Sequence, residues 1–402
     1  MSMGKPKIRF QGYTEDWEQR KFSEFVKNVA KKNKDNLDLE PYAVTNDRGF
    51  IAQKDAHDDF GYMKDTDRRA YNIVPPNSFA YNPARINVGS LGYYTGSENV
   101  IVSSLYEVFQ TEDYIDDRFL WHWLKSDHFP KWIERLQEGS VRLYFYFDKL
   151  IQCQMMVPTI KEQNQISAYF DSLDKLITLH QRKCDETKKL KKYMLQKMFP
   201  QNGHSVPEIR FAGFTEDWEQ RKFPEFVSFY NGLTYTPDDI QEMGTLVLRS
   251  SNVKNGEIVD ADNVYVNDKV ATSENVQVGD IIVVVRNGSR ALIGKHAQIK
   301  ASMPNTVIGA FMSGIRSEHS SFVNALLDTS AFDNEIAKNM GATINQITGY
   351  MFSKMEFMVP LEEEQQQIGQ YFSSLDHLIT LHQQKCEKLQ KIKKFMLQNM
   401  FV

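Results

Sequence analysis

The chain contains the same two segments twice, and this internal repeat constrains its fold more than any other feature. The first segment reads PKIRFQGYTEDWEQRKFSEFV from Pro6 and returns from Pro207 as PEIRFAGFTEDWEQRKFPEFV, with four differences in 21 positions. The second reads VPTIKEQNQISAYFDSLDKLITLHQRKCDETKKLKKYMLQKMF from Val157 and returns from Val359 as VPLEEEQQQIGQYFSSLDHLITLHQQKCEKLQKIKKFMLQNMF. The offsets, 6 to 207 and 157 to 359, are nearly equal. A solenoid repeats every ~20–50 residues, so this longer period indicates a tandem duplication of whole domains.

The stretches between the repeated segments, roughly 27–156 and 228–358, are hard to align with each other. Each half is therefore a variable domain bracketed by shared sequence, and two similar halves imply approximate two-fold symmetry. A duplication kept for stability alone is the alternative, but it gives no reason for near-identical flanks beside divergent middles. We predict a mixed α/β (α+β) fold with the following parts: a first variable domain at 1–156, a long helix at 157–200, a second variable domain at 201–358 and a second long helix at 359–402.

The second repeated segment has the hydrophobic spacing of a long helix. Its apolar residues alternate by four and three, which is the a/d spacing of a coiled coil. The positions are Ile166, Phe170, Leu173, Ile177, His180 and Cys184 in the first copy, and Ile368, Phe372, Leu375, Ile379, His382 and Cys386 in the second. We predict that the two helices pack as an antiparallel, pseudo-two-fold symmetric coiled coil that acts as a spacer between the domains. Leu176, Leu190 and Ile392 widen the apolar stripe and leave surface for a third partner.

Two histidine–cysteine pairs in these helices allow two interpretations. Antiparallel packing would bring His180 and Cys184 next to His382 and Cys386, in the manner of a Cys₂His₂ zinc site. The same residues could instead form a polar layer that fixes the register of a coiled coil. No other zinc-type cysteine spacing occurs in the chain. We therefore favour the polar layer and predict no metal.

The bulk composition is that of a globular protein. The hydrophobic fraction is 41% and the charged fraction is 25%, as in soluble domains. No signal peptide is visible at the polar, basic N-terminus, and no apolar run approaches the ~20 residues of a membrane span. Three cysteines do not make a disulfide framework, so we expect the reducing cytoplasm. The formal net charge of −4 would be awkward for a DNA-binding protein unless positive charge is concentrated on one face or a partner supplies it.

Within the variable domains, several predicted strands end in polar loops. The buried strand Ile281–Val285 precedes a turn with two arginines, and Leu246–Leu248 precedes Arg249. In each domain a short predicted helix, Phe119–Lys125 or Ser321–Thr329, precedes a glycine-led segment. Arg, Asn, Gln and Ser side chains on loops can read base edges, although any surface loop contains such residues. The DNA-binding candidates are Asn82, Arg85, Ser90, Tyr93, Ser140, Arg142 and Tyr144 in the first domain, and Arg249, Ser251, Asn252, Arg286, Asn287, Ser289, Arg290, Lys295, Thr343, Asn345 and Gln346 in the second.

Catalytic motifs are missing, and the near matches fail on specific residues. The stretch from Gly288 to Lys295 resembles a phosphate loop, but five residues separate its glycines and His296 replaces the Ser or Thr that holds magnesium. Tyr81–Arg85 begins like an amino-methyltransferase motif, yet it lacks the second proline and the aromatic residue that would clamp a flipped base. We predict no catalytic residues and no cofactor in this chain.

These segments together resemble the specificity subunits of bacterial type I restriction–modification enzymes, over essentially the whole chain. The matching features are Trp17 and Trp218 with their surroundings, the Glu162-Gln163 and Glu364-Gln365 pairs that lead the helices, and Gly279-Asp280, Asn287-Gly288 and Ile293-Gly294-Lys295 in the second domain. The resemblance implies a non-catalytic subunit in which each recognition domain reads one half of a split double-stranded DNA site. It also implies two methyltransferase subunits that use S-adenosylmethionine to methylate adenine, and restriction subunits that use ATP and magnesium to translocate and cleave DNA.

Two other classes of function stay open at this stage. The rival reading is a structural adaptor that binds only proteins through its helices and has no DNA readout of its own. A self-contained nuclease is disfavoured by the missing motifs. Binding to a pool of random duplexes, with and without methyltransferase, distinguishes the adaptor from the recognition subunit.

Overall fold

The structure is a computed structural model, and it describes residues 4–46, 49–56, 67–140, 143–201, 203–340 and 345–402. The chain divides into two compact units, each of which takes part of both long helices. Unit 1 comprises residues 1–180 and 384–402, and unit 2 comprises 181–383. The two long helices have equal length, with α5 at Ile160–Lys197 and α9 at Glu362–Asn399. In the described part of the chain, neither these helices nor any other is apolar enough over a sufficient length to cross a membrane.

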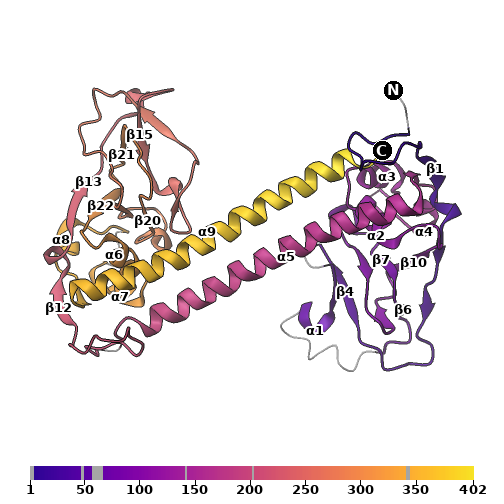
Figure 1. The fold of residues 1–402 in the computed structure, drawn as a ribbon, viewed down its shortest axis with the longest axis horizontal. Coiled ribbons are helices and arrows are strands. Elements are labelled where there is room, and N and C mark those ends of the chain that lie inside the picture. Colours follow the sequence, from indigo (N-terminus) through magenta and orange to yellow (C-terminus); the bar gives the residue numbers. More distant parts are fainter. Residues whose placement is uncertain (1–3, 47–48, 57–66, 141–142, 202, 341–344) are drawn as a thin grey trace. The chain divides into compact units, whose positions relative to one another are not determined.

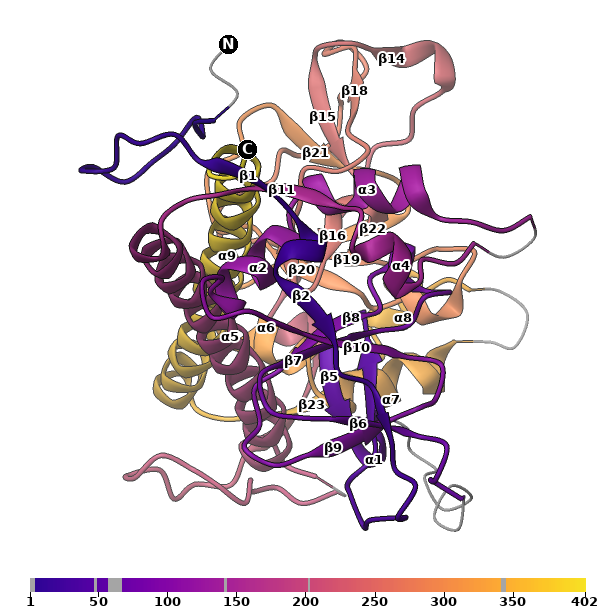
Figure 2. The ribbon, with the colours of Figure 1, turned by 90° about the vertical axis from the view of Figure 1, so that its right-hand side faces the viewer.

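Unit 1 is a mixed α/β domain (Figures 1 and 2). Its main sheet has the strand order β2-β10-β7-β8, with all neighbours antiparallel. These strands are Val26–Asn28, Glu107–Thr111, Ser78–Tyr81 and Leu91–Tyr94. The smaller sheets are β1 (Glu18–Lys21) with β11 (Gln154–Val157), β3 (Lys31–Lys32) with β6 (Asn72–Val74) and β9 (Val100–Val102), and β4 (Tyr42–Thr45) with β5 (Gly49–Ala52). The shorter helices are α1 (Gln53–Ala56), α2 (Asp117–Leu124), α3 (His128–Leu136) and α4 (Phe147–Leu150).

Unit 2 repeats this architecture with a larger second sheet. The order β13-β22-β19-β20 is the counterpart of the main sheet in unit 1, and its strands are Ser228–Asn231, Met312–Arg316, Ile281–Val284 and His296–Gln298. The other sheets are β12 (Glu219–Lys222) with β23 (Glu356–Val359), β16 (Val253–Lys254) with β17 (Glu257–Ile258), and β14 (Ile240–Gln241), β18 (Val264–Val266), β15 (Thr245–Leu248) and β21 (Thr306–Ile308) in that order. The shorter helices are α6 (Ser320–Leu327), α7 (Ser330–Asn339) and α8 (Gly349–Phe352).

The variable middles of the two halves therefore contain main sheets of the same topology despite their divergent sequences. In both units the first strand pairs with the last, and the two strands between them in sequence complete the sheet. The predicted strands at Leu246–Leu248 and Ile281–Val285 and the predicted short helices are confirmed within one or two residues at most ends. α2 begins where the Asp116 carboxylate accepts a hydrogen bond from the Phe119 N–H at 2.7 Å, a standard N-cap.

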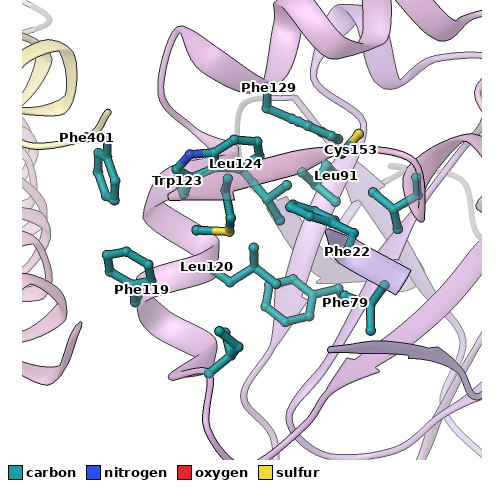
Figure 3. Packing of buried hydrophobic residues seen from close by; sticks show 14 of the residues in the cluster. Phe22, Phe79, Leu91, Phe119, Leu120, Trp123, Leu124, Phe129, Cys153 and Phe401 are labelled. Atoms are coloured by element: carbon teal, nitrogen blue, oxygen red, sulfur yellow. The ribbon is translucent and has the colours of Figure 1, made fainter. Parts of the chain in front are cut away.

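Each domain core contains the start of one long helix and the end of the other. In unit 1 the start of α5 and the last residues of the chain join one apolar cluster with the sheet, α2 and α3 (Figure 3). The Phe401 ring lies 5.4 Å from Phe119 and 5.8 Å from Phe170. In unit 2 Phe199 takes the same place, 5.7 Å from Phe322 and 5.9 Å from the ring of α9 that corresponds to Phe170. Residues predicted to form only a spacer thus also build the domain cores.

The helix segments run antiparallel within each unit. In unit 1 the Lys393 ammonium lies 2.5 Å from Asp174, and in unit 2 Lys191 lies 2.6 Å from Asp376. Each lysine–aspartate pair is the counterpart of the other under the sequence repeat. Most of the predicted seam positions are buried and the rest are half-buried: Ile166, Phe170, Leu173, Cys184, Ile368, Phe372, Leu375 and Cys386 in the first group, and Ile177, His180, Ile379 and His382 in the second. Coiled-coil packing along this seam stays a prediction.

A buried ion pair joins each repeated N-terminal segment to the start of a long helix. Arg9 donates two hydrogen bonds to the Glu162 carboxylate, each 2.7 Å long. Arg210 binds Glu364 in the same fork at 2.7 and 2.8 Å. The two carboxylates are 1% and 0% exposed. Because an unpaired buried charge is costly, each pair holds its segment against its helix.

The helix α2 is attached to α5 by a polar contact that unit 2 lacks at the matching positions. Arg118 and His122 of α2 both bind the Asp171 carboxylate, the imidazole at 2.9 Å. The corresponding residues of unit 2 are serine, alanine and serine (Ser321, Ala325 and Ser373). Burial lowers the pKa of His122, and this outweighs the opposing effect of its hydrogen bond to the Asp171 carboxylate. His122 is fully buried and is therefore neutral at pH 7.

We expect Glu364→Gln to destabilise unit 2 strongly. The substitution leaves the Arg210 guanidinium buried without a charged partner, which costs about 3–5 kcal/mol in comparable pairs. Trp218 is the one tryptophan in the sequence of unit 2, so urea unfolding followed by fluorescence, with the unit 1 tryptophans replaced by phenylalanine, measures the loss. The control is Glu225→Gln, whose pair with Arg221 is half-exposed and should contribute about 1 kcal/mol or less. Equal losses in the two variants would contradict a dominant role for the buried pair.

We expect unit 1 to lose stability as the pH falls from 7 to 5, in part through His122. Because its folded-state pKa is lowered, the unfolded chain takes up a proton that the folded chain refuses below about pH 6.5. The free energy of unfolding therefore decreases with falling pH in this window. His122→Gln keeps an N–H donor for Asp171 but cannot titrate, so its urea midpoint should vary less with pH. His204→Gln, at an exposed site, should behave like the unaltered chain. An unchanged pH profile in His122→Gln would refute this assignment.

Candidate nucleic-acid interface

In unit 2 the strand β19 delivers the predicted arginine loop to an exposed edge of the domain. The four residues of the strand are buried, and residues 286–290 that follow are exposed or half-buried. The last buried residue, Val285, donates its N–H to Phe311 at 3.0 Å and accepts from the Ile347 N–H at 2.8 Å. Asn345 then donates its side-chain amide to the Gly288 carbonyl at 3.1 Å. The arginine loop and the segment at 345–347 thus lie side by side.

A third predicted group joins the same edge. The Asn287 amide donates to the Ser250 hydroxyl at 3.3 Å, and the Lys295 ammonium donates to the Ser250 carbonyl at 3.3 Å. Ser251 next to it is exposed. Arg249 is held at this edge by the Asp262 carboxylate at 2.6 Å, which uses part of its guanidinium. Three loops that lie far apart in the sequence therefore meet at one place.

The first domain forms the equivalent edge from different residues. After β7, Pro83 accepts a hydrogen bond from the Phe145 N–H at 3.1 Å. Both residues lie 202 positions before Val285 and Ile347, which make the matching bond in unit 2. Asn82 caps the turn, because its carboxamide oxygen accepts from the Ala84 N–H at 3.0 Å. The loops before and after these anchors are therefore equivalent in the two domains.

A groove of about 970 Å³ runs along this edge of unit 1. Tyr144 and Tyr146 stand on its wall with their rings stacked, 5.5 Å between centroids and 2° between planes. The groove is lined by a mixture of basic, amide, aromatic and apolar residues, with one acidic side chain, Glu107: Ala30, Lys32, Asn72, Asn82, Pro83, Ala84, Arg85, Asn87, Ser104, Leu105, Tyr106, Glu107, Leu143, Tyr144 and Tyr146. Such a lining combines positive charge with stacking surfaces, as nucleic-acid grooves do.

The loop arginines differ from most other described arginines in their electrostatic partners. Eight described arginines pair with a carboxylate within 4 Å, and one of them, Arg249, lies at the edge of unit 2: Arg9, Arg20, Arg118, Arg182, Arg210, Arg221, Arg249 and Arg316. No described carboxylate lies at ion-pair distance from Arg85, Arg286 or Arg290, and the same holds for Arg68, Arg69 and Arg135 outside these loops. The positive charge on the candidate edges is therefore available to an anionic ligand.

The structure corrects two of the predicted DNA contacts. Ser90 is 2% exposed and its hydroxyl donates to the Val44 carbonyl at 3.1 Å. Asn252 is fully buried and its amide donates to the Ala261 carbonyl at 2.7 Å. Both polar side chains satisfy backbone groups in the interior, so neither can reach a base edge. Tyr93 is half-buried and donates its hydroxyl to Asp117 at 3.0 Å, which assigns it to the packing of α2.

The remaining candidates fall into two groups. The half-buried candidates at the edges are Asn82, Tyr144, Arg249, Asn287, Lys295, Asn345 and Gln346, whereas Arg85, Ser140, Ser251, Arg286, Ser289 and Arg290 are exposed there or in the adjoining segments. The predicted contacts at Arg142 and Thr343 lie outside the described residues. Contact with DNA by any of these residues stays a prediction.

Sequence reasoning missed several edge residues because they are not typical base-reading side chains. Lys32 and Tyr146 line the groove of unit 1, and Phe311 underlies the arginine loop of unit 2. The sequence contains two separate signals that could have pointed to the groove, the pair Tyr144 and Tyr146 and the basic KKNK run at 31–34. Among the residues with described positions, no group of three or more His, Cys, Asp or Glu side chains is arranged to hold a metal ion.

Comparison with known proteins agrees with this duplicated architecture. The family model of the "Type I restriction modification DNA specificity domain" matches residues 14–189 and again 215–391. The chain is 24% identical to the type I restriction enzyme MjaVIII specificity subunit of Methanocaldococcus jannaschii, over 94% of this chain and 91% of that protein. It is 23% identical to the StySPI specificity subunit of Salmonella potsdam over 44% of this chain and 40% of that protein.

The fold also matches a solved structure over nearly its full length. The crystal structure of a type I restriction–modification S subunit from M. genitalium covers 99% of both chains, with a TM-score of 0.65 and 13% sequence identity. At this identity the likeness establishes the fold alone. The two family matches together cover most of the chain, and they fall on the two repeats that were evident in the sequence. The chain belongs to the type I restriction–modification DNA specificity family, with one copy of the family domain in each half.

Proposed function

We propose that the chain is the non-catalytic specificity subunit of a type I restriction–modification enzyme and reads a bipartite DNA site, one half-site with each domain. The observation that carries this proposal is the pair of equivalent loop edges. Both are anchored by the same backbone hydrogen bond, at Phe145 and at Ile347. One edge presents tyrosines with Arg85, and the other presents Arg286 and Arg290 with two side-chain amides. Equivalent loop positions with different hydrogen-bond donors and acceptors are suited to bind two different base sequences.

We further propose that the helices hold two methyltransferase subunits, and through them restriction subunits. Apolar side chains are exposed at repeated positions on both long helices, and a partner protein could bury them. In unit 1 these include Leu176 and Phe395, and in unit 2 they include Leu190, Tyr193 and Leu378. Ile392, predicted to belong to this stripe, instead packs partly against the core of unit 1. S-adenosylmethionine, ATP and magnesium would bind the partner subunits, which supply all catalytic steps.

Local charge explains how an acidic chain can serve this role. The net charge of −4 opposes binding to a duplex at long range, whereas typical site binders contact ~6–10 phosphates. The unpaired arginines supply base contacts, and partner subunits that enclose the duplex would supply most of the phosphate contacts. This chain would then determine which sequence is bound, and the whole assembly would provide most of the affinity for DNA.

We expect the isolated chain to bind its DNA site weakly and to gain affinity sharply when methyltransferase subunits are present. The measurement is fluorescence anisotropy with a duplex selected from a random pool, at a fixed salt concentration. A scrambled duplex of the same composition is the control. Nanomolar specific binding by the chain alone, without any gain in affinity on adding the partner, would contradict the proposal that partner subunits supply most of the phosphate contacts. Selection of no sequence in either condition would favour the protein-only adaptor.

We expect single loop substitutions to alter one half-site only. Arg85→Lys should relax the half read by the first domain, and Arg290→Lys should relax the other, because lysine lacks the fork that pairs with two base acceptors. A lost contact of this kind is worth ~1–3 kcal/mol of discrimination. Arg135→Lys is the matched control, since Arg135 is another arginine of unit 1 without a described carboxylate partner but lies on α3. Sequencing of selected duplexes gives the result. A change in both half-sites from one substitution would refute the one-domain, one-half-site assignment.

A further inference from the structure

The Arg286 side chain is held over an aromatic ring at the edge of unit 2. Its guanidinium carbon lies 5.1 Å from the centroid of Phe311, within the range of a cation–π contact. The backbone fixes the same pair, because the N–H groups of Val285 and Arg286 both donate to the Phe311 carbonyl, at 3.0 and 3.2 Å. Arg286 also forms an isolated antiparallel bridge with Gln346. Two neighbouring segments, at Phe311 and at Gln346, thus hold the backbone of the arginine, and the Phe311 ring lies beside its side chain.

The ring and the guanidinium remain open to a ligand. Phe311 is 53% exposed and Arg286 is exposed. No described carboxylate pairs with Arg286, in contrast to Arg249, whose guanidinium at the same edge binds Asp262 at 2.6 Å. A cation–π contact with the ring does not use the guanidinium N–H groups as hydrogen-bond donors to an acceptor. Those N–H groups are the ones that form paired hydrogen bonds.

An arginine that lies over an aromatic ring and has no described carboxylate partner discriminates among the base edges. In the major groove guanine presents two adjacent acceptors, N7 and O6, which match the arginine fork. The other bases present at most one acceptor beside a donor or a methyl group. A phosphate also accepts two hydrogen bonds from arginine, but it carries no sequence information. An arginine fixed in advance loses less conformational freedom on binding, which favours a geometrically demanding base contact.

We propose that Arg286 reads a guanine in the half-site of the second domain and that Phe311 is its positioning residue. This inference rests on the proposed function and adds to it the identity of one base and the device that orients its reader. Phe311 does not touch the base in this arrangement. It restricts the guanidinium to the plane in which both acceptors are reached.

The test selects duplexes from a random pool with the full chain and its methyltransferase subunits, and compares substitutions at the two positions. Arg286→Lys should lower the preference for guanine at one position of the second half-site by about 5- to 150-fold, the range for a lost bidentate contact. Phe311→Leu should lower it at the same position by a smaller factor. Phe311→Tyr keeps the ring and should retain the preference.

Tyr350→Leu is the matched control, because Tyr350 is 68% exposed in the same unit and carries the Lys354 ammonium 4.4 Å above its ring. It should leave the guanine position unchanged. The half-site of the first domain serves as an internal check on folding and should persist in every variant. An unchanged guanine preference in Arg286→Lys would indicate a phosphate contact, which lysine can also make, and would overturn the inference. A second half-site without guanine would also overturn it. An unaltered chain that selects no sequence at all would instead overturn the proposed function.

Discussion

The buried arginine–glutamate pair at the start of each long helix is the contact on which the two domains depend. Arg9 with Glu162, and Arg210 with Glu364, join residues more than 150 positions apart. Neither carboxylate could stay in the interior without its partner. Each pair closes a domain by bringing its first segment to its exit helix, and the short pairing of β1 with β11, or of β12 with β23, lies beside it with the same register. The residues between these fixed ends are then free to diverge.

This division explains what could be predicted from the sequence. The two long helices follow from local hydrophobic periodicity and from the near-identity of the two copies. The common sheet order of the two middles could not be predicted, because it depends on pairing between strands such as β2 and β10 that lie about 80 residues apart, and their sequences differ between the halves. Nor does the a/d pattern reveal that Phe170 and Phe372 face a domain core, since both environments select the same apolar side chains.

The residues of the candidate edges were predicted from residue type. Residue type alone selects some residues that are buried and misses others that lie at the edge. Polar residues after a strand can point outward or can satisfy buried backbone groups, as Ser90 and Asn252 do. Aromatic residues that support an arginine look like core residues in the sequence, so Phe311 was missed. Only the fold decides between these roles, because each depends on which distant segment lies next to the side chain. The convergence of loops from 249–252, 286–295 and 345–347 is likewise a property of the sheet.

The charge distribution connects this architecture to recognition. An overall acidic chain repels a duplex at long range, and salt screens that repulsion over about 10 Å. At contact distance, individual charged groups decide whether the electrostatic interaction with DNA is attractive or repulsive. Most of the described arginines are already neutralised by carboxylates of the fold. On the candidate edges, the guanidinium groups of Arg85, Arg286 and Arg290 have no described carboxylate partner and can exchange water for base or phosphate acceptors. Such a protein gains little binding free energy from DNA of arbitrary sequence and more from a sequence whose acceptors pair with these donors. This difference in affinity is what a subunit needs if it selects sites for other subunits to modify.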